Sequence, residues 1–165
     1  MSVPTPSDEL ESPLPEQGRL AGIDFGTVRI GIATCDTSQR WVTPYETYNR
    51  RNERLDAKYF IELAHTEQIV GWVLGLPIHC DGKESQKSGE VRLFAKWLME
   101  HTGRPATFFD ERFTSSEARR LLQDSGLSPK KKKKNLDRLA AHLILSHFLD
   151  NRHYAGKTEG LDDGS

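Results

Sequence analysis

The spacing of hydrophobic residues along the chain first predicts a group of short β-strands. Two apolar runs, Leu20–Phe25 and Ile30–Cys35, flank a Gly-Thr pair with turn chemistry and predict a β-hairpin. Trp41–Tyr48 predicts a third strand, and Pro44 within it favours a bend or an edge position because proline has no N–H to donate to a neighbouring strand. Short turns join these strands, so we expect an antiparallel unit.

The rest of the chain alternates strands with helices. Ile69–Leu76 is continuously apolar, which is typical of a strand buried on both faces in a parallel arrangement, and Ala106–Phe109 predicts a last, short strand. Apolar residues at helical spacing predict the helices Leu55–Glu67, Glu90–His101, Thr114–Gln123 and Asn135–Leu149. The order βββαβαβαα predicts an α/β fold with a mixed sheet of about five strands and helices on both faces.

The folded part is expected to be one domain, residues 19–154, in a chain of 165 residues. Residues 1–18 hold four prolines and four acidic residues but no lysine or arginine, a composition that cannot bury a core. We therefore expect an acidic, proline-rich, disordered tail there. Residues 155–165 look similar and predict a second disordered tail.

Composition also indicates where the protein works. The N-terminus has neither the basic region nor the apolar run of a signal peptide, and no apolar run approaches the length of a membrane span. The two cysteines, Cys35 and Cys80, lack metal-type spacing, and Cys35 fits a small core residue of a strand. We expect a cytoplasmic protein with no membrane partner.

Basic residues are concentrated late in the chain. Residues 112–138 hold nine basic and three acidic residues, a net charge of +6, although the whole chain has a net charge of −1. Such asymmetry suggests a surface that binds polyanions. The candidates are the run Lys130, Lys131, Lys132, Lys133 and Lys134, and an area around Arg29, Arg112 and Arg119. A solvated loop or a localisation-type patch is the alternative for the lysine run, which by itself is weak evidence.

Acidic residues mark three ends of the predicted elements. Asp24 lies where the first buried strand runs out into a turn, a costly place for a carboxylate without a partner or a metal, although it could simply cap the turn. Asp110 and Glu111 close the last strand, and neighbouring side chains on a strand point to opposite faces. Asp137 opens the last helix.

Asp137 shares one helix face with four small or apolar residues. Ala140, Ala141, Ile144 and Phe148 follow it at helical spacing, so this face should pack on the sheet. An acid in the first turn of a helix is also explained by the helix dipole, so capping duty and ligand duty are both open. Three carboxylates without a His or Cys partner suit Mg²⁺ or Mn²⁺, and one use of such a cluster is two-metal phosphodiester hydrolysis.

Four segments together resemble a known family. GIDFGTVRIGIA, VLGLPIHCDGKES, the DER and TS residues between Asp110 and Ser115, and LDRLAAHLIL are similar to the YqgF/RuvX family of Holliday-junction-resolvase-like nucleases. The resemblance implies a ribonuclease H-like fold and a divalent-metal nuclease. It also implies trimming of the 5′ end of pre-16S ribosomal RNA in ribosome biogenesis, with branched DNA as an alternative substrate.

The resemblance also assigns the site residues. It makes Asp24, Glu111 and Asp137 both the catalytic residues and the metal ligands. Asp110 or Asp81 could replace Glu111 as the middle carboxylate, because the strand that holds this acid in related resolvases here has none. The expected assembly is a monomer or a weak homodimer.

Two other functions compete with this interpretation. The segment GIDFGTVRIGIA also resembles the first phosphate-binding loop of the actin and sugar-kinase superfamily. Those proteins use two such domains and a second glycine-rich loop, whereas one domain is expected here. A nucleic-acid-binding ribosome assembly factor without catalysis would keep the basic surface. It would have no need of all three acids.

Overall fold

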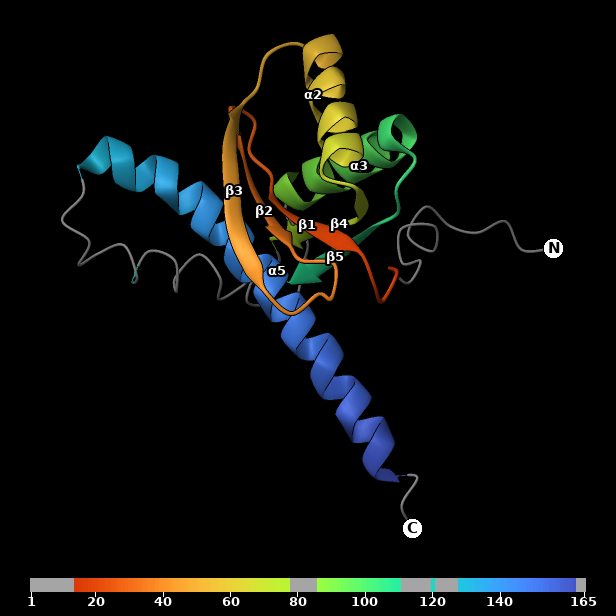
Figure 1. The fold of residues 1–165 in the computed structure, drawn as a ribbon. Coiled ribbons are helices and arrows are strands. Elements are labelled where there is room, and N and C mark those ends of the chain that lie inside the picture. The colour runs from red at the N-terminus through yellow and green to blue at the C-terminus, as the bar shows by residue number, and fades with distance from the viewer. Residues whose placement is uncertain (1–13, 78–85, 111–119, 121–127, 163–165) are drawn as a thin grey trace.

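The computed structural model describes residues 14–77, 86–110, 120 and 128–162, and within this part it forms one five-stranded sheet with helices on both faces (Figure 1). The strands are β1 (Arg19–Asp24), β2 (Arg29–Cys35), β3 (Val42–Asn49), β4 (Ile69–Leu76) and β5 (Ala106–Asp110). The helices are α2 (Glu53–Thr66), α3 (Gln86–Thr102) and α5 (Pro129–Asp162). The predicted helix Thr114–Gln123 lies outside the described residues apart from residue 120.

The sheet has the predicted mixed topology. Its order is β3-β2-β1-β4-β5, in which β1, β2 and β3 pair antiparallel and β4 and β5 add in parallel. β3 is an edge strand, as Pro44 predicted, and the register between β2 and β3 shifts between Ile32 and Ala33, beside the pairing of Ala33 with Pro44. The parallel strands β1, β4 and β5 end at the same edge of the sheet, which brings Asp24 and Asp110 to that edge.

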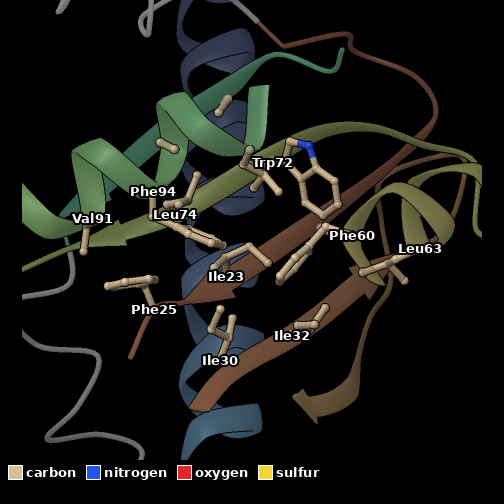
Figure 2. Close-up of a cluster of buried hydrophobic side chains, with 14 of the residues drawn as sticks. Ile23, Phe25, Ile30, Ile32, Phe60, Leu63, Trp72, Leu74, Val91 and Phe94 are labelled. Atoms are coloured by element: carbon tan, nitrogen blue, oxygen red, sulfur yellow. The ribbon is translucent and has the colours of Figure 1, made fainter. Parts of the chain in front are cut away.

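Two separate cores cover the two faces of the sheet. On one face α2 and α3 enclose an aromatic cluster built around Phe60, Trp72 and Phe94, together with Ile23 and Phe25 of β1 and its exit (Figure 2). On the other face α5 crosses the sheet, and its Ile144 and Leu145 are fully buried (Figure 1). The buried run of β4 contributes to both cores, which explains why it shows no alternation of apolar and polar residues.

Glycines let α5 lie directly on the strands. A Cβ atom added at Gly31 of β2 would lie 2.0 Å from the carbonyl oxygen of Asp137, and one at Gly22 of β1 would lie 2.7 Å from the carbonyl oxygen of Ala141. Any side chain at these positions would push the helix away. The small residues Ala140 and Ala141 of α5 complete this close packing, and the predicted inward face of the helix is confirmed.

The packed part of the chain begins before residue 19, where the sequence predicted that it would begin. Leu14, only 4% exposed, belongs to the core beneath α5 and lies against Gly71 of β4. The Gln39 side chain donates hydrogen bonds to the carbonyl oxygens of Pro15 and Gly18, at 2.9 and 3.0 Å, and Arg152 of α5 donates to Pro15 as well. The packed domain therefore includes residues 14–18, which lie within the expected tail.

The last helix is longer than predicted at both ends. It begins at Pro129 rather than Asn135, with the Ser128 side chain accepting a hydrogen bond from the backbone N–H of Lys131, the pattern of a serine N-cap followed by proline. It runs to Asp162, so it enters the segment that was expected to be a disordered tail. The lysine run is helical rather than a loop, and its role in binding polyanions stays a prediction.

Candidate active site

Asp24 faces the α5 side of the sheet. Its two neighbours, Ile23 and Phe25, both belong to the core beneath α2 and α3, and side chains alternate between the faces of a strand. The half-buried Asp24 side chain at the end of β1 therefore points to the face that α5 crosses. The strand ends here because the turn residues that follow leave the sheet.

Asp137 lies over the same point of the sheet. The α5 backbone at Asp137 contacts β2 at Gly31, and Gly31 is the cross-strand partner of Asp24. Two acids that are 113 positions apart along the chain are thus brought together at one edge, on one face. Asp137 lies eight residues into α5, beyond the first turn, so helix-dipole or capping duty does not explain it.

Arg29 joins this pair of acids from β2. It lies two residues before Gly31 and therefore on the same face of the strand. Its Nε donates a hydrogen bond to Oδ2 of Asp137 at 3.0 Å, and the two side chains are 29% and 22% exposed. The sequence singled out Arg29 only as a nucleic-acid contact, and nothing in the sequence shows that it pairs with an acid 108 positions away.

Asp110 lies on the other face of the sheet. Phe108 of β5 packs into the core beneath α2 and α3, whereas Phe109 belongs to the α5 side, with its ring 6.2 Å from that of His147. The alternation places Asp110 with Phe108, away from Asp24 and Asp137. Glu111 and Asp81, the other candidates for the middle carboxylate, lie outside the described residues.

The described part of the basic segment forms the first turns of α5. Lys130 and Lys131 are exposed and Lys132 is half-buried. At 1.5 Å per residue, Lys130 lies about 10 Å along the helix axis from Asp137. This end of α5 projects beyond the edge strand β3 (Figure 1). Lys133 and Lys134 are helical as well, but their side chains, like Arg112 and Arg119, lie outside the described part.

The described residues supply two carboxylate side chains suited to a metal, but not a complete metal site. Among residues 14–77, 86–110, 120 and 128–162, no three His, Cys, Asp or Glu side chains are grouped closely enough to hold an ion. Asp24 and Asp137 offer carboxylates only, the chemistry that Mg²⁺ and Mn²⁺ prefer, and the Arg29 guanidinium beside Asp137 shows that the site accepts a positive charge. The residues present fit a hard divalent cation.

Two strand glycines lie directly under the last helix. Gly22 and Gly31 both receive the backbone of α5, and Gly31 does so at Asp137 itself. Their effect on the site is therefore indirect, because they set the position of the helix that carries Asp137.

None of the helices in the described part of the chain has both the length and the apolar character needed to cross a bilayer.

The chain shares its fold with a protein of known structure. The structure titled "T. thermophilus RuvC in complex with Holliday junction substrate" has a TM-score of 0.52, at 15% sequence identity over 82% of this chain and 95% of that one. The likeness confirms the ribonuclease H-like fold.

The sequence has closer relatives. A protein of Rhodopirellula baltica named pre-16S rRNA nuclease is 46% identical over 165 residues, covering 99% of this chain and 95% of its own length. A protein of Rhodobacter capsulatus with the same name is 37% identical over 153 residues, covering 93% and 96%. The family model described as "RuvX: Holliday junction resolvase" matches residues 18–151. The resemblance inferred from the four sequence segments is confirmed: this chain belongs to the RuvX family.

Proposed function

We propose that this protein is a nuclease that hydrolyses phosphodiester bonds with the help of Mg²⁺ or Mn²⁺. The observation that carries the proposal is the crossing of α5 over Gly31, which brings Asp137 to Asp24 at the carboxyl edge of the sheet. Glu111 is the proposed third ligand. The position of Asp110 on the opposite face supports this choice over Asp110.

The residues of the chain divide the work between them. A bound divalent ion would supply an activated water and stabilise the leaving oxygen. Asp24 and Asp137 would hold such an ion through their carboxylates, and the rigid sheet and helix fix the positions of both residues. Arg29 is paired with Asp137, and its guanidinium is suited to contact a substrate phosphate at the same place. The lysines of α5 attract the nucleic-acid backbone without reading its sequence.

The proposed substrate is the 5′ end of pre-16S ribosomal RNA, because the relatives from Rhodopirellula baltica and Rhodobacter capsulatus, which cover 99% and 93% of the chain, carry that name. The protein would then act in the cytoplasm in ribosome biogenesis, as a monomer or a weak homodimer. The family description favours a second candidate, resolution of branched DNA. A non-catalytic assembly factor would keep the basic α5 surface but would not need Asp24 beside Asp137.

A cleavage assay tests the proposal. The purified chain is incubated with a pre-16S leader RNA or a four-way DNA junction, with Mg²⁺, Mn²⁺ or EDTA. We expect metal-dependent cleavage, with the RNA cut faster. Asp24→Asn removes a ligand charge with little change of shape and should abolish cleavage, whereas Asp110→Asn, on the other face of the sheet, should cut at about the parental rate. Equal cleavage by the parent and Asp24→Asn would refute the metal site.

A further inference from the structure

A cavity of about 420 Å³ opens on the face of the sheet that carries α2 and α3, against the β1–β2 turn that follows Asp24. Four segments line it: the β1–β2 turn with Phe25 before it, the link between β3 and α2, the first turn of α2, and α3. Its volume falls within the range of small-ligand sites. Its lining includes Phe25, Thr27, Arg50, Arg51, Leu93 and Trp97.

The floor of the cavity is aromatic. The rings of Phe25 and Phe94 are 4.7 Å apart, and Trp97 stacks on Phe94 at 5.4 Å with an angle of 22° between the rings. Figure 2 shows Phe25 and Phe94 at one end of the buried cluster. Leu93, 71% exposed, extends this apolar surface at the mouth. Phe25 and Phe94 are only 7% and 5% exposed and support the floor from below, whereas the half-buried Trp97 and the exposed Leu93 present the apolar surface to the cavity. An aromatic surface of this kind binds an unstacked nucleobase.

Two arginines and three acidic residues surround the floor, and the acids are Glu53, Asp56 and Glu90. The Arg50 guanidinium lies 5.2 Å from the centre of the Phe25 ring and is paired with Asp56 at 3.4 Å, so it is held in place. The neighbouring Arg51 is exposed. The carboxylate of Glu53 accepts a hydrogen bond from Nε1 of Trp97 at 3.3 Å. Arginines suit a backbone phosphate, and carboxylates accept hydrogen bonds from the exocyclic amino groups of bases.

The cavity is within reach of a strand bound at Asp24. Thr27, one of its walls, follows Asp24 by three residues, so their Cα atoms are at most about 11 Å apart. The backbone N–H of Arg50 donates to the carbonyl oxygen of Val28 at 2.9 Å and ties two walls together. Val28, 69% exposed, offers an apolar surface on this turn.

The two sites nevertheless lie on opposite faces of the sheet. Asp24 points toward α5, whereas Phe25 points into the α2/α3 core. A strand held at Asp24 can fill the cavity only by passing around the β1–β2 turn with one base pulled out of its stack. We infer that this cavity binds one unpaired nucleobase of the substrate strand near the scissile phosphate. The inference rests on the proposed nuclease function and narrows the substrate to nucleic acid that is unpaired at this point.

Binding of abasic oligonucleotides to the full chain tests the inference. A fluorescent single-stranded RNA with the leader sequence is synthesised with one abasic nucleotide at each position in turn, and dissociation constants are measured in EDTA. For the parent we expect one position to weaken binding roughly tenfold, as for the loss of one stacked base. In Trp97→Ala the same abasic position should change the affinity less than about twofold, because the contact is already lost.

A second pair of variants avoids the loss of a packed ring. Leu93→Glu puts a charge at the cavity mouth and should weaken binding of the intact RNA several-fold. Ile61→Glu is its matched control, because Ile61 is 44% exposed on α2 and does not line the cavity, and it should bind like the parent. A flat abasic profile, or equal affinities for the two Glu variants, overturns the inference.

Cleavage of the same oligonucleotides in Mg²⁺ separates this inference from the proposed function. A parent that cleaves but shows a flat abasic profile overturns the base site alone. A parent that shows the Trp97-dependent position but does not cleave supports the base site and overturns the nuclease. A parent that neither binds nor cleaves overturns both.

Discussion

The most direct test of how the fold builds the site is Gly31→Ala. Gly31 has no left-handed backbone conformation, so space is the only obstacle to a side chain. The added Cβ would lie 2.0 Å from the carbonyl oxygen of Asp137 and 2.4 Å from its carbonyl carbon. Ordinary contact begins near 3.4 Å, so α5 must retreat by about 1.4 Å, the difference between 3.4 and 2.0 Å, or β2 must bend away.

This displacement has a cost in stability and a cost in activity. Overpacking of a core costs about 1–3 kcal/mol, and the buried Ala141, Ile144 and Leu145 lie on the same helix face, so we expect the upper part of that range. The lower entropy of the unfolded chain with alanine offsets up to about 1 kcal/mol. A net loss of about 2 kcal/mol should lower the Tm by roughly 4–8 °C. Displacing Asp137 by about 1 Å should reduce cleavage about 100-fold.

Gly89→Ala is the matched control. A Cβ at Gly89 of α3 meets nothing within 4 Å, so the same change there should stabilise the protein by up to about 1 kcal/mol through helix propensity and leave cleavage unaltered. The measurements are thermal unfolding and metal-dependent cleavage of both variants. If Gly31→Ala melts and cleaves like Gly89→Ala, the close crossing of α5 does not position Asp137. A lower Tm with parental cleavage would show that the reaction does not need Asp137 in that position.

Other changes test the charges around the site. Arg29→Ala frees the Asp137 carboxylate, so the rise in Tm on adding Mg²⁺ should be larger than for the parent; an equal rise would mean that the ion pair does not compete with the metal. Replacing all five residues of Lys130–Lys134 with Gln, which preserves the helix, should weaken binding of all nucleic acids similarly and flatten its salt dependence; an unchanged salt slope would place the binding surface elsewhere. Hydrogen bonds from the Ser38 side chain and the Trp41 backbone hold the pKa of Asp36 well below its usual value. The ionised carboxylate therefore stabilises the fold at pH values above its unfolded-state pKa, which is near 4, and this stabilisation is lost as the pH falls below that value. Asp36→Ala should therefore unfold at lower urea than the parent at pH 7, with a smaller difference near pH 3, and a difference independent of pH would contradict this role.

The sequence by itself determined the elements and the chemistry of the candidate site. Alternation and apolar runs are local signals, so they identified five strands and the edge position of the strand with Pro44. Helical spacing identified the inward face of α5. The start of that helix was not predicted: helical spacing of apolar residues marks Asn135 onward, and the lysines before it, which have no apolar face, gave no such signal.

Only the tertiary structure decided which residues meet. The distance between Asp24 and Asp137 depends on strand register and on where α5 crosses β2, and both result from the packing of whole surfaces against each other. The face of Asp110 follows from the burial of Phe108 on one side of the sheet and Phe109 on the other, although both are equally apolar in the sequence. The Arg29–Asp137 pair likewise forms only when the chain has folded. A sequence pattern records the preference of each residue for burial and secondary structure, whereas contacts between distant segments are fixed by the close packing of the complete fold.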